Sequence, residues 1–329
     1  MKVSFNLNAG PLWLGIAAVG FLLLFLGASL PIEAQAVEAE NQAQQTYRLP
    51  LPVNEVVLTF HALDLHGLPV NDLKRDEIRV FDNERPAHRI VAFDSVLDRP
   101  IRAGILIDTS ESMQQALPWD KILAERFVQR IFRQASDQAF VMDFGYSSEF
   151  AQSWTNNPNA LSISVQNIQA GRMNPLGGTA IFDTIFRACL YGFGKIGPAS
   201  SSNFILLFSD GEDNASHSTI EEALNACQKS NTAIYAFRLP SAPGRDSLGP
   251  MTLAELASRS GGRVFSAVDS DDAIWQDLKT IESEIRNHYR LVYDPVRLKH
   301  DGSFHRIAIL PPDRVTSISV RSGYYAPSQ

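Results

Sequence analysis

Cysteine is scarce in this 329-residue chain, which holds only Cys189 and Cys227, so the protein is not a disulfide-rich scaffold. Both cysteines fall on the apolar stripes of expected helices. Buried free thiols are the favoured interpretation. The alternative is a bridge between neighbouring helices, which export to an oxidising compartment would permit.

Long basic runs are also missing. The chain holds 29 Lys and Arg residues against 36 Asp and Glu residues, for a formal net charge of -7. This balance provides no basic patch for nucleic acid, so we expect no nucleic-acid partner. With 45% hydrophobic and 20% charged residues, the chain is an ordinary globular one with room for a large domain and a smaller one.

Charge is absent from positions 3–32, and positions 12–30 are almost wholly apolar. Lys2 precedes this stretch and a small-x-small pattern at 34–36 follows it, which is the order of a secretory signal. The stretch is also long enough to remain in a bilayer as an uncleaved anchor, which needs about 20 residues. We therefore expect residues 1–36 to be a signal peptide or membrane anchor. The protein is then exported, being periplasmic, secreted, or anchored facing outside the cytoplasm.

The most informative motif is Asp108-Thr109-Ser110-Glu111-Ser112, which follows an apolar run. An aspartate and two serines at alternate positions on a strand-to-helix turn can direct their oxygens toward one small hard cation. Alone, such a motif is more often a helix cap, because Asp and Ser are preferred there. Two further loops favour the metal site.

These loops carry Thr179, after two glycines at the start of a helical pattern, and Asp210, after the apolar run 204–208. Functional loops of an open parallel sheet gather at the carboxyl ends of its strands, so the three loops are expected to meet. The predicted ligands are all oxygen donors: Asp108, Ser110, Ser112, Thr179 and Asp210. A few neutral hydroxyls with waters favour octahedral Mg²⁺, with Mn²⁺ or Ca²⁺ as alternatives.

The three loops together resemble the von Willebrand factor type A domain with its metal-ion-dependent adhesion site. In that family Asp-x-Ser-x-Ser, a Thr and a second Asp hold the cation, and a partner's carboxylate completes its shell. The resemblance covers roughly residues 99–286, and the five ligand positions match without substitution. Glu111 stands where the family often has Gly; this extra carboxylate would either raise metal affinity or deter acidic ligands. The stretches at 177–180, 209–214 and 321–324 further resemble a bacterial exported subfamily.

Strand and helix patterns alternate across residues 99–286, which predicts an α/β domain with a doubly wound, mostly parallel sheet. The flanks, residues 49–98 and 287–329, show period-two alternation instead, which predicts antiparallel strands. Neither flank is long enough to bury a core alone, so we expect both to form one small β-sandwich around the inserted domain. Two separate hairpin appendages are the alternative. Residues 37–48, rich in Ala, Glu and Gln, are expected to be a linker.

The resemblance implies a binding module that is not an enzyme and that presents its cation to an Asp or Glu of a protein partner. The alternative is a metal-dependent hydrolase of the phosphatase type on a similar sheet. Such a phosphatase needs a second aspartate two positions after its nucleophilic one, and Ser110 occupies that place. No Gly-x-Ser-x-Gly elbow supports a serine nucleophile either. We therefore expect adhesion.

Overall fold

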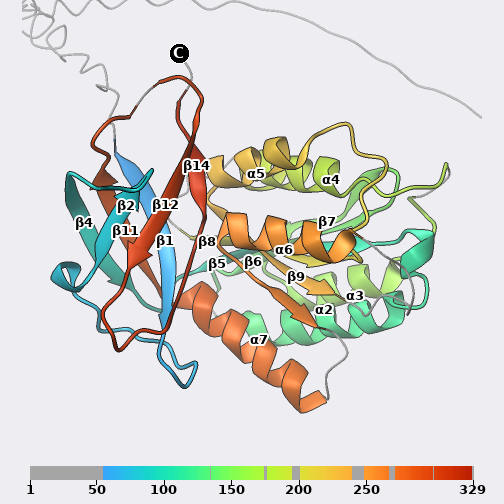
Figure 1. The fold of residues 1–329 in the computed structure, drawn as a ribbon. Helices are drawn as coiled ribbons and strands as arrows, with labels where there is room; N and C mark the ends of the chain where they lie inside the picture. Colours follow the sequence, from blue (N-terminus) through green and yellow to red (C-terminus); the bar gives the residue numbers. More distant parts are fainter. Residues whose placement is uncertain are drawn as a thin grey trace, which may run out of the picture. The chain divides into compact units, whose positions relative to one another are not determined.

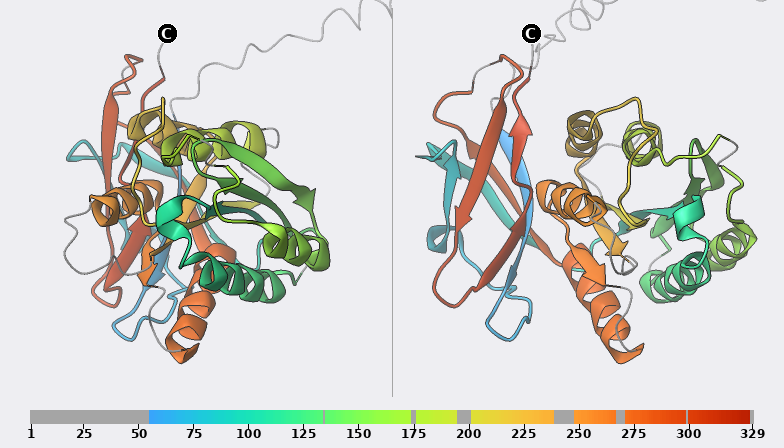
Figure 2. Two further views of the ribbon diagram at one scale, coloured as in Figure 1. Left: turned by 90° about the vertical axis from the view of Figure 1, so that its right-hand side faces the viewer. Right: turned by 45° about the vertical axis from the view of Figure 1, so that its right-hand side comes forward.

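The computed structural model describes residues 55–133, 135–173, 176–194, 201–238, 248–266, 271–298 and 300–327, which form an α/β domain and a β-sandwich (Figures 1 and 2). The expected signal or anchor and the expected linker lie outside the described residues. Within the described residues, no helix has the length and apolar character needed to cross a membrane.

Six strands form the central sheet, in the order β10-β9-β8-β5-β6-β7. Their bounds are β5 (Ile101–Asp108), β6 (Gln138–Phe144), β7 (Ser148–Thr155), β8 (Ser202–Phe208), β9 (Thr232–Arg238) and β10 (Val264–Ser266). Every neighbouring pair is parallel except β6 and β7. The chain adds β6 on one side of β5 and later β8 on the other, so the strand order reverses beside β5. The predicted doubly wound α/β fold is confirmed.

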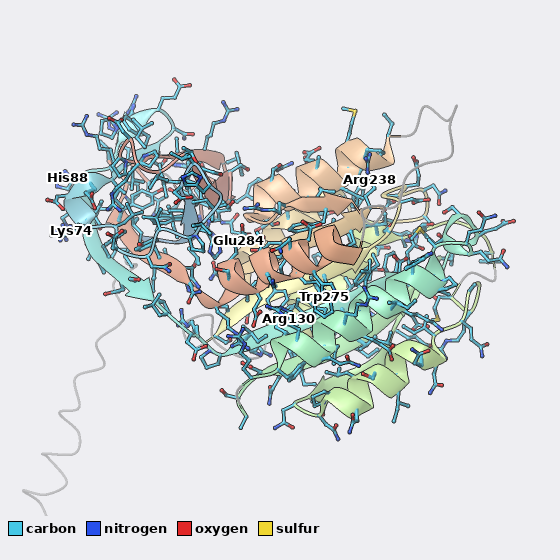
Figure 3. All side chains as sticks on the ribbon, turned by 90° about the horizontal axis from the view of Figure 1, so that it is seen from below. Lys74, His88, Arg130, Arg238, Trp275 and Glu284 are labelled. Atoms are coloured by element: carbon cyan, nitrogen blue, oxygen red, sulfur yellow. A yellow bond between two sulfur atoms is a disulfide. The ribbon has the colours of Figure 1, made fainter. Side chains whose placement is uncertain are left out.

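Helices cover both faces of this sheet (Figure 2). One face carries α2 (Leu117–Ile131), α3 (Pro158–Asn167) and α7 (Asp271–Arg286); the other carries α4 (Ile181–Arg187), the π-helical η3 (Ala188–Phe193), α5 (Ile220–Lys229) and α6 (Gly249–Ser260). Figure 3 shows α2 and α7 side by side, with Arg130 near Trp275, and Arg130 also pairs with Glu282 at 2.9 Å. The sequence patterns did not predict α3, although Asn157 caps it and Pro158 opens it.

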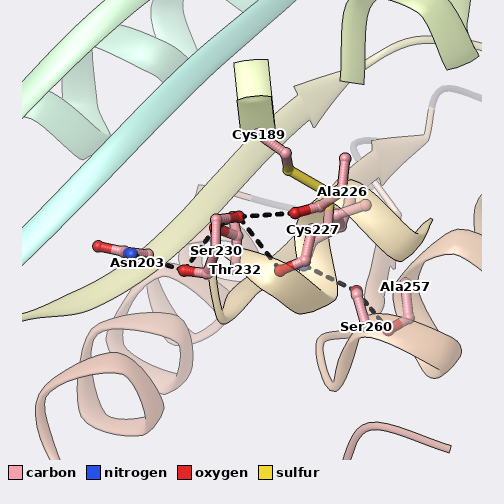
Figure 4. The surroundings of a disulfide bond; sticks show 9 residues. Cys189, Asn203, Ala226, Cys227, Ser230, Thr232, Ala257 and Ser260 are labelled. Carbon is pink, nitrogen blue, oxygen red and sulfur yellow. Dashed lines mark hydrogen bonds between the residues drawn. A yellow bond between two sulfur atoms is a disulfide. The ribbon is translucent and has the colours of Figure 1, made fainter. Parts of the chain in front are cut away.

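Cys189 of η3 and Cys227 of α5 form a disulfide (Figure 4), so the favoured interpretation of two free thiols was wrong. Their Cα atoms are 5.0 Å apart, and both side chains lie in the apolar core between the sheet and its helices. The apolar spacing on each helix indicated burial but carried no information on how the two helices approach each other.

Reduction of this bridge should lower the stability of the α/β domain. The bridge closes a loop of 38 residues, and the chain-entropy model assigns such a loop about 4 kcal/mol of unfolding free energy. Urea unfolding with and without reductant measures the effect, and a Cys189→Ala/Cys227→Ala variant should not respond to reductant. Two free thiols detected in the oxidised protein would contradict the bridge.

The β-sandwich contains two four-stranded sheets, ordered β13-β1-β11-β4 and β14-β12-β2-β3. The strands before the α/β domain are β1 (Val56–Leu63), β2 (Arg79–Asp82), β3 (Arg85–Pro86) and β4 (Arg89–Val96); those after it are β11 (His288–Asp294), β12 (Phe304–Leu310), β13 (Ser317–Val320) and β14 (Gly323–Tyr325). Each sheet mixes both flanks, because β1 pairs with β11 and β13 while β2 pairs with β12. Two separate hairpin appendages do not describe this arrangement.

A buried carboxylate joins the two flanks inside the sandwich. Asp82 of β2 accepts hydrogen bonds from the hydroxyls of Tyr293, at 2.8 Å, and Tyr324, at 2.7 Å. Its other oxygen lies 2.7 Å from Nδ1 of His305. All three partners belong to the flank after the α/β domain. Because a buried polar group without partners is costly, Asp82 is satisfied only when both flanks are folded together.

A second buried acid fastens the point where the chain leaves the α/β domain. Arg286, the last residue of α7, places Nη2 2.7 Å from Oδ2 of Asp137, and both side chains are buried. Asp137 also accepts the backbone N–H of Ile101, at 3.0 Å, where β5 begins. The exit of the chain is therefore held next to its entrance.

Candidate metal site

Asp108 ends β5 and is fully buried. The strand register pairs Ile107 with Phe208, so Asp108 and Ser209 follow neighbouring strands at the point where the strand order reverses. Oδ1 of Asp108 accepts the backbone N–H of Ser110 at 2.9 Å, and Oδ2 accepts the hydroxyl of Ser209 at 2.7 Å. The carboxylate is thus oriented from both sides. The strand-end placement predicted for it is observed.

The charge of Asp108 has no positive partner in the described part of the chain. Burial raises the pKa of this carboxyl to about 7; hydrogen bonds from Ser110 and Ser209 lower it, and the charge of Asp210 raises it. Neutral donors and a second nearby carboxylate surround it, and no lysine or arginine pairs with it. A divalent cation is the charge that would complement this arrangement.

The two serines of the motif converge. Their Oγ atoms are 3.2 Å apart, with Ser110 buried and Ser112 exposed at the surface. The short 3₁₀ turn η2 (Glu111–Met113) brings them together, and the N–H of Thr109 donates to the carbonyl of Phe144 at 2.7 Å, which fixes the loop to the end of β6. Two hydroxyls therefore lie together on the turn that follows the buried Asp108. Glu111 is exposed on the same turn.

The Thr179 loop is tied to the loop that carries Asp210. The backbone N–H of Thr179 donates to Oδ1 of Asn214 at 2.7 Å, and its carbonyl accepts the N–H of Asn214 at 3.0 Å. Gly178 has a φ of +97°, and a Cβ there would lie 2.8 Å from Oδ1 of Asn214, so only glycine fits. Among the described residues, the Thr179 hydroxyl has no hydrogen-bond partner, which leaves it available to a ligand.

The structure thus brings Asp108, Ser110 and Ser112 into one hydrogen-bonded group. Asp210 is half-buried, acts on the charge of Asp108, and accepts the N–H of Glu212 at 3.1 Å. Thr179 is held by Asn214, which lies on the same loop as Asp210. Among the described residues, no group of three or more His, Cys, Asp or Glu side chains is arranged for a metal ion. A cation here would therefore depend on hydroxyl ligands, and this oxygen donor set fits a small hard ion.

Sequence reasoning missed Ser209 and Asp120, which both bear on this site. Ser209 orients Asp108. In the sequence, the only sign of this role was the position of Ser209 next to Asp210. Asp120 lies in the first turn of α2, fully buried, with no hydrogen-bond partner for either oxygen. Burial, with a smaller contribution from the charge of Asp108, raises its pKa from 3.8 to about 8. The Pro-Trp-Asp stretch is typical of a helix start and did not distinguish a buried acid from an exposed one.

Replacing Asp120 with asparagine should flatten the dependence of stability on pH. An acid whose pKa is raised by folding stabilises the protein when protonated, so this contribution is lost as pH rises from 3.8 through about 8. Each proton bound only by the folded state changes the unfolding free energy by up to about 1.4 kcal/mol per pH unit. Urea unfolding in chelator across this pH range should therefore show a steeper decline for the original protein. Glu125→Gln, on the same helix, should keep the steep decline, and equal slopes for all three proteins would refute the assignment.

Three comparisons place the chain among known proteins. The family model for the von Willebrand factor type A domain matches residues 104–283, more than half of the chain. No curated protein matches it. Among solved structures, the conserved hypothetical protein BatB from Bacteroides thetaiotaomicron is 17% identical with a TM-score of 0.45, covering 56% of this chain and 98% of its own.

An aerotolerance-related membrane protein from Bacteroides fragilis is 18% identical with a TM-score of 0.45, over 56% of this chain and 98% of its own. Proximal thread matrix protein 1 from the mussel byssus, described with a zinc-occupied MIDAS motif, is 16% identical with a TM-score of 0.46 over 58% of this chain and 49% of its own. Identities and TM-scores this low do not assign a function to the chain. On the match of the family model, the chain belongs to the von Willebrand factor type A domain family.

Proposed function

We propose that this protein is an exported, non-enzymatic adhesion module. In this proposal, Asp108, Ser110, Ser112, Thr179 and Asp210 hold a Mg²⁺-type ion that captures an Asp or Glu carboxylate of a partner protein. The observation that carries the proposal is the fully buried Asp108, which faces two converging serine hydroxyls and has no positive partner among the described residues.

The residues of the site would have separate roles. Asp108 supplies negative charge and holds the Ser110 backbone in place, while Ser209 keeps that carboxylate oriented. Neutral hydroxyls leave the ion with most of its positive charge, because only two carboxylates contribute to the set. A bound divalent cation would supply an open coordination position for an external carboxylate. Binding, and not bond cleavage, is the chemistry that this arrangement supports.

Two further features favour this proposal. The Ser209 hydroxyl lies 2.7 Å from Asp108, but it donates to that carboxylate and has no histidine among its partners, so nothing activates it as a nucleophile. The disulfide between Cys189 and Cys227 favours an oxidising compartment, in line with the expected export. The phosphatase alternative still lacks its second aspartate at Ser110.

Capture from an envelope extract tests the proposal. The immobilised protein should retain partner protein in Mg²⁺ and release it in chelator. Thr179→Val removes one hydroxyl while keeping the backbone bonds to Asn214, so it should abolish Mg²⁺-dependent capture. Thr280→Val, the same change at a half-buried position of α7, should not.

Chemical blocking of carboxyl groups in the extract, by conversion to amides, should also abolish capture. Retention that survives chelator, or that is unaffected by amidation of the extract, would refute the proposed mode of binding.

A further inference from the structure

A pocket lies where the β-sandwich meets the amino-terminal ends of β8 and β9, at the opposite end of the central sheet from Asp108. Thr59 and His61 of β1 line one side, and Ser202 and Thr232 line the other. Figure 4 shows three of its lining residues, Asn203, Thr232 and Ser260, in the surroundings of the disulfide. Both parts of the protein therefore contribute to one pocket.

The charge of this lining is unlike that of the chain. The protein has 36 Asp and Glu residues against 29 Lys and Arg residues, yet no aspartate or glutamate lines the pocket. Its lining does include Arg259, Arg321, His61 and His288. The only charged side chains of the lining at neutral pH are thus two arginines, Arg259 and Arg321, which favours an anionic ligand.

Arg321 is the cation that lacks an anion. One of its Nη atoms donates to the carbonyl of Val57 at 2.8 Å, while its buried Nε has no hydrogen-bond partner. Burial lowers its pKa to about 10, so it remains charged at neutral pH, and no carboxylate pairs with it in the described residues. Arg259 differs, because it pairs with Glu255 at 2.6 Å and Glu221 at 3.4 Å.

The two histidines add donors and acceptors but no charge at neutral pH. Their rings are 6.0 Å apart, and Nδ1 of His61 lies 2.9 Å from the carbonyl of Asn287. Burial is the main cause that lowers the pKa of His61 to about 3 and that of His288 to about 4, and the charge of Arg99 also contributes for His288.

The rest of the lining suits a small organic molecule. Phe204, Tyr235 and Phe304 provide apolar surface, and Ser202 and Asn231 provide short polar side chains. We propose that this pocket binds a small organic anion whose carboxylate or phosphate group pairs with Arg321. Such a ligand would contact the β-sandwich and the α/β domain at once, and the proposal is independent of the metal site.

Thermal unfolding in chelator, with the metal site inactive, tests the pocket in the full chain. Acetate, benzoate and inorganic phosphate are compared with chloride at equal ionic strength. A ligand that binds only the folded state should raise the melting temperature by at least about 2 °C at saturating concentration. A response to acetate and benzoate identifies a carboxylate ligand, a response to phosphate identifies a phosphate ligand, and no response to any of them overturns the proposal.

Two variants separate specific binding from general salt effects, since phosphate stabilises many proteins by exclusion from their surfaces. Arg321→Gln should lose the response, whereas Arg306→Gln, an exposed residue of the same sandwich outside the pocket, should keep it. An unchanged response in Arg321→Gln overturns the proposal. If that variant fails to fold, binding is tested instead by the histidine NMR signals of the original protein. The signals of His61 and His288 should shift with the anion, and unshifted signals refute binding in this pocket.

Discussion

Asp108→Ala should abolish Mg²⁺ binding while the central sheet stays folded. Aspartate supplies the buried negative charge and accepts the N–H of Ser110 and the hydroxyl of Ser209, and alanine does neither. Loss of an outer partner of a metal ligand alone typically costs roughly 10- to 100-fold in affinity, so loss of this carboxylate should exceed about 100-fold. Calorimetric titration with Mg²⁺ measures the change, and the disappearance of Mg²⁺-dependent thermal stabilisation provides a second measure.

Glu111→Gln is the matched control, because it removes an exposed carboxylate from the same turn. It should retain Mg²⁺ binding, with a modest change in affinity that shows whether this extra charge strengthens the site. Mg²⁺ affinity equal to that of the original protein in Asp108→Ala would contradict the site assignment. Circular dichroism should show an intact fold in both variants, since the carboxyl at position 108 is itself costly to bury in its charged form.

Deletion of residues 289–329 should unfold the remaining flank before the α/β domain. Without β11, β12, β13 and β14, the apolar faces of β1 and β2 lose their cover, including Leu58, Phe60 and Val80. Asp82 also loses all three of its partners and becomes a buried acid without a hydrogen bond. Limited proteolysis should therefore cut within residues 55–96.

The α/β domain provides the internal control for this experiment. Its cores involve its own strands and helices, so it should resist the protease after the deletion. Protection of residues 55–96 equal to that in the full chain would show that the first flank folds without the second. A milder variant, Tyr324→Phe, removes one hydrogen bond to Asp82 and should destabilise the sandwich by about 1 kcal/mol.

The sequence predicted most of the architecture because its signals are local and periodic. Alternating strand and helix patterns identified the central sheet, and the period-two pattern of both flanks identified the strands that the sandwich combines. The metal-site motif was visible for the same reason, since Asp108, Ser110 and Ser112 are separated by single residues on one turn. Their convergence follows from the geometry of that turn and requires no knowledge of distant contacts.

Most of the features that escaped prediction depend on distant contacts. Whether Cys189 meets Cys227 depends on how η3 lies against α5, and neither helix pattern contains that information. The role of Asn214 in holding Thr179, the burial of Asp120 and the positive pocket around Arg321 likewise arise only after folding. Short elements without an apolar stripe of their own, such as β3, left no periodic signal at all.

The adjacent entrance and exit of the α/β domain determine how a pulling force would cross the molecule. Force applied at the metal-site end reaches the sandwich through side-chain contacts such as Asn231 with Thr59, and through two covalent connections, 97–100 and Asn287, which lie together because Val96 pairs with His288. Both connections pull β4 and β11 from the same end. The two strands are therefore pulled in the same direction and do not slide past each other. The resistance then falls on the antiparallel ladder between β11 and β1, whose hydrogen bonds lie across the direction of pull and are loaded in shear. Under the proposed function, tension from a bound partner would therefore load this ladder along its strands.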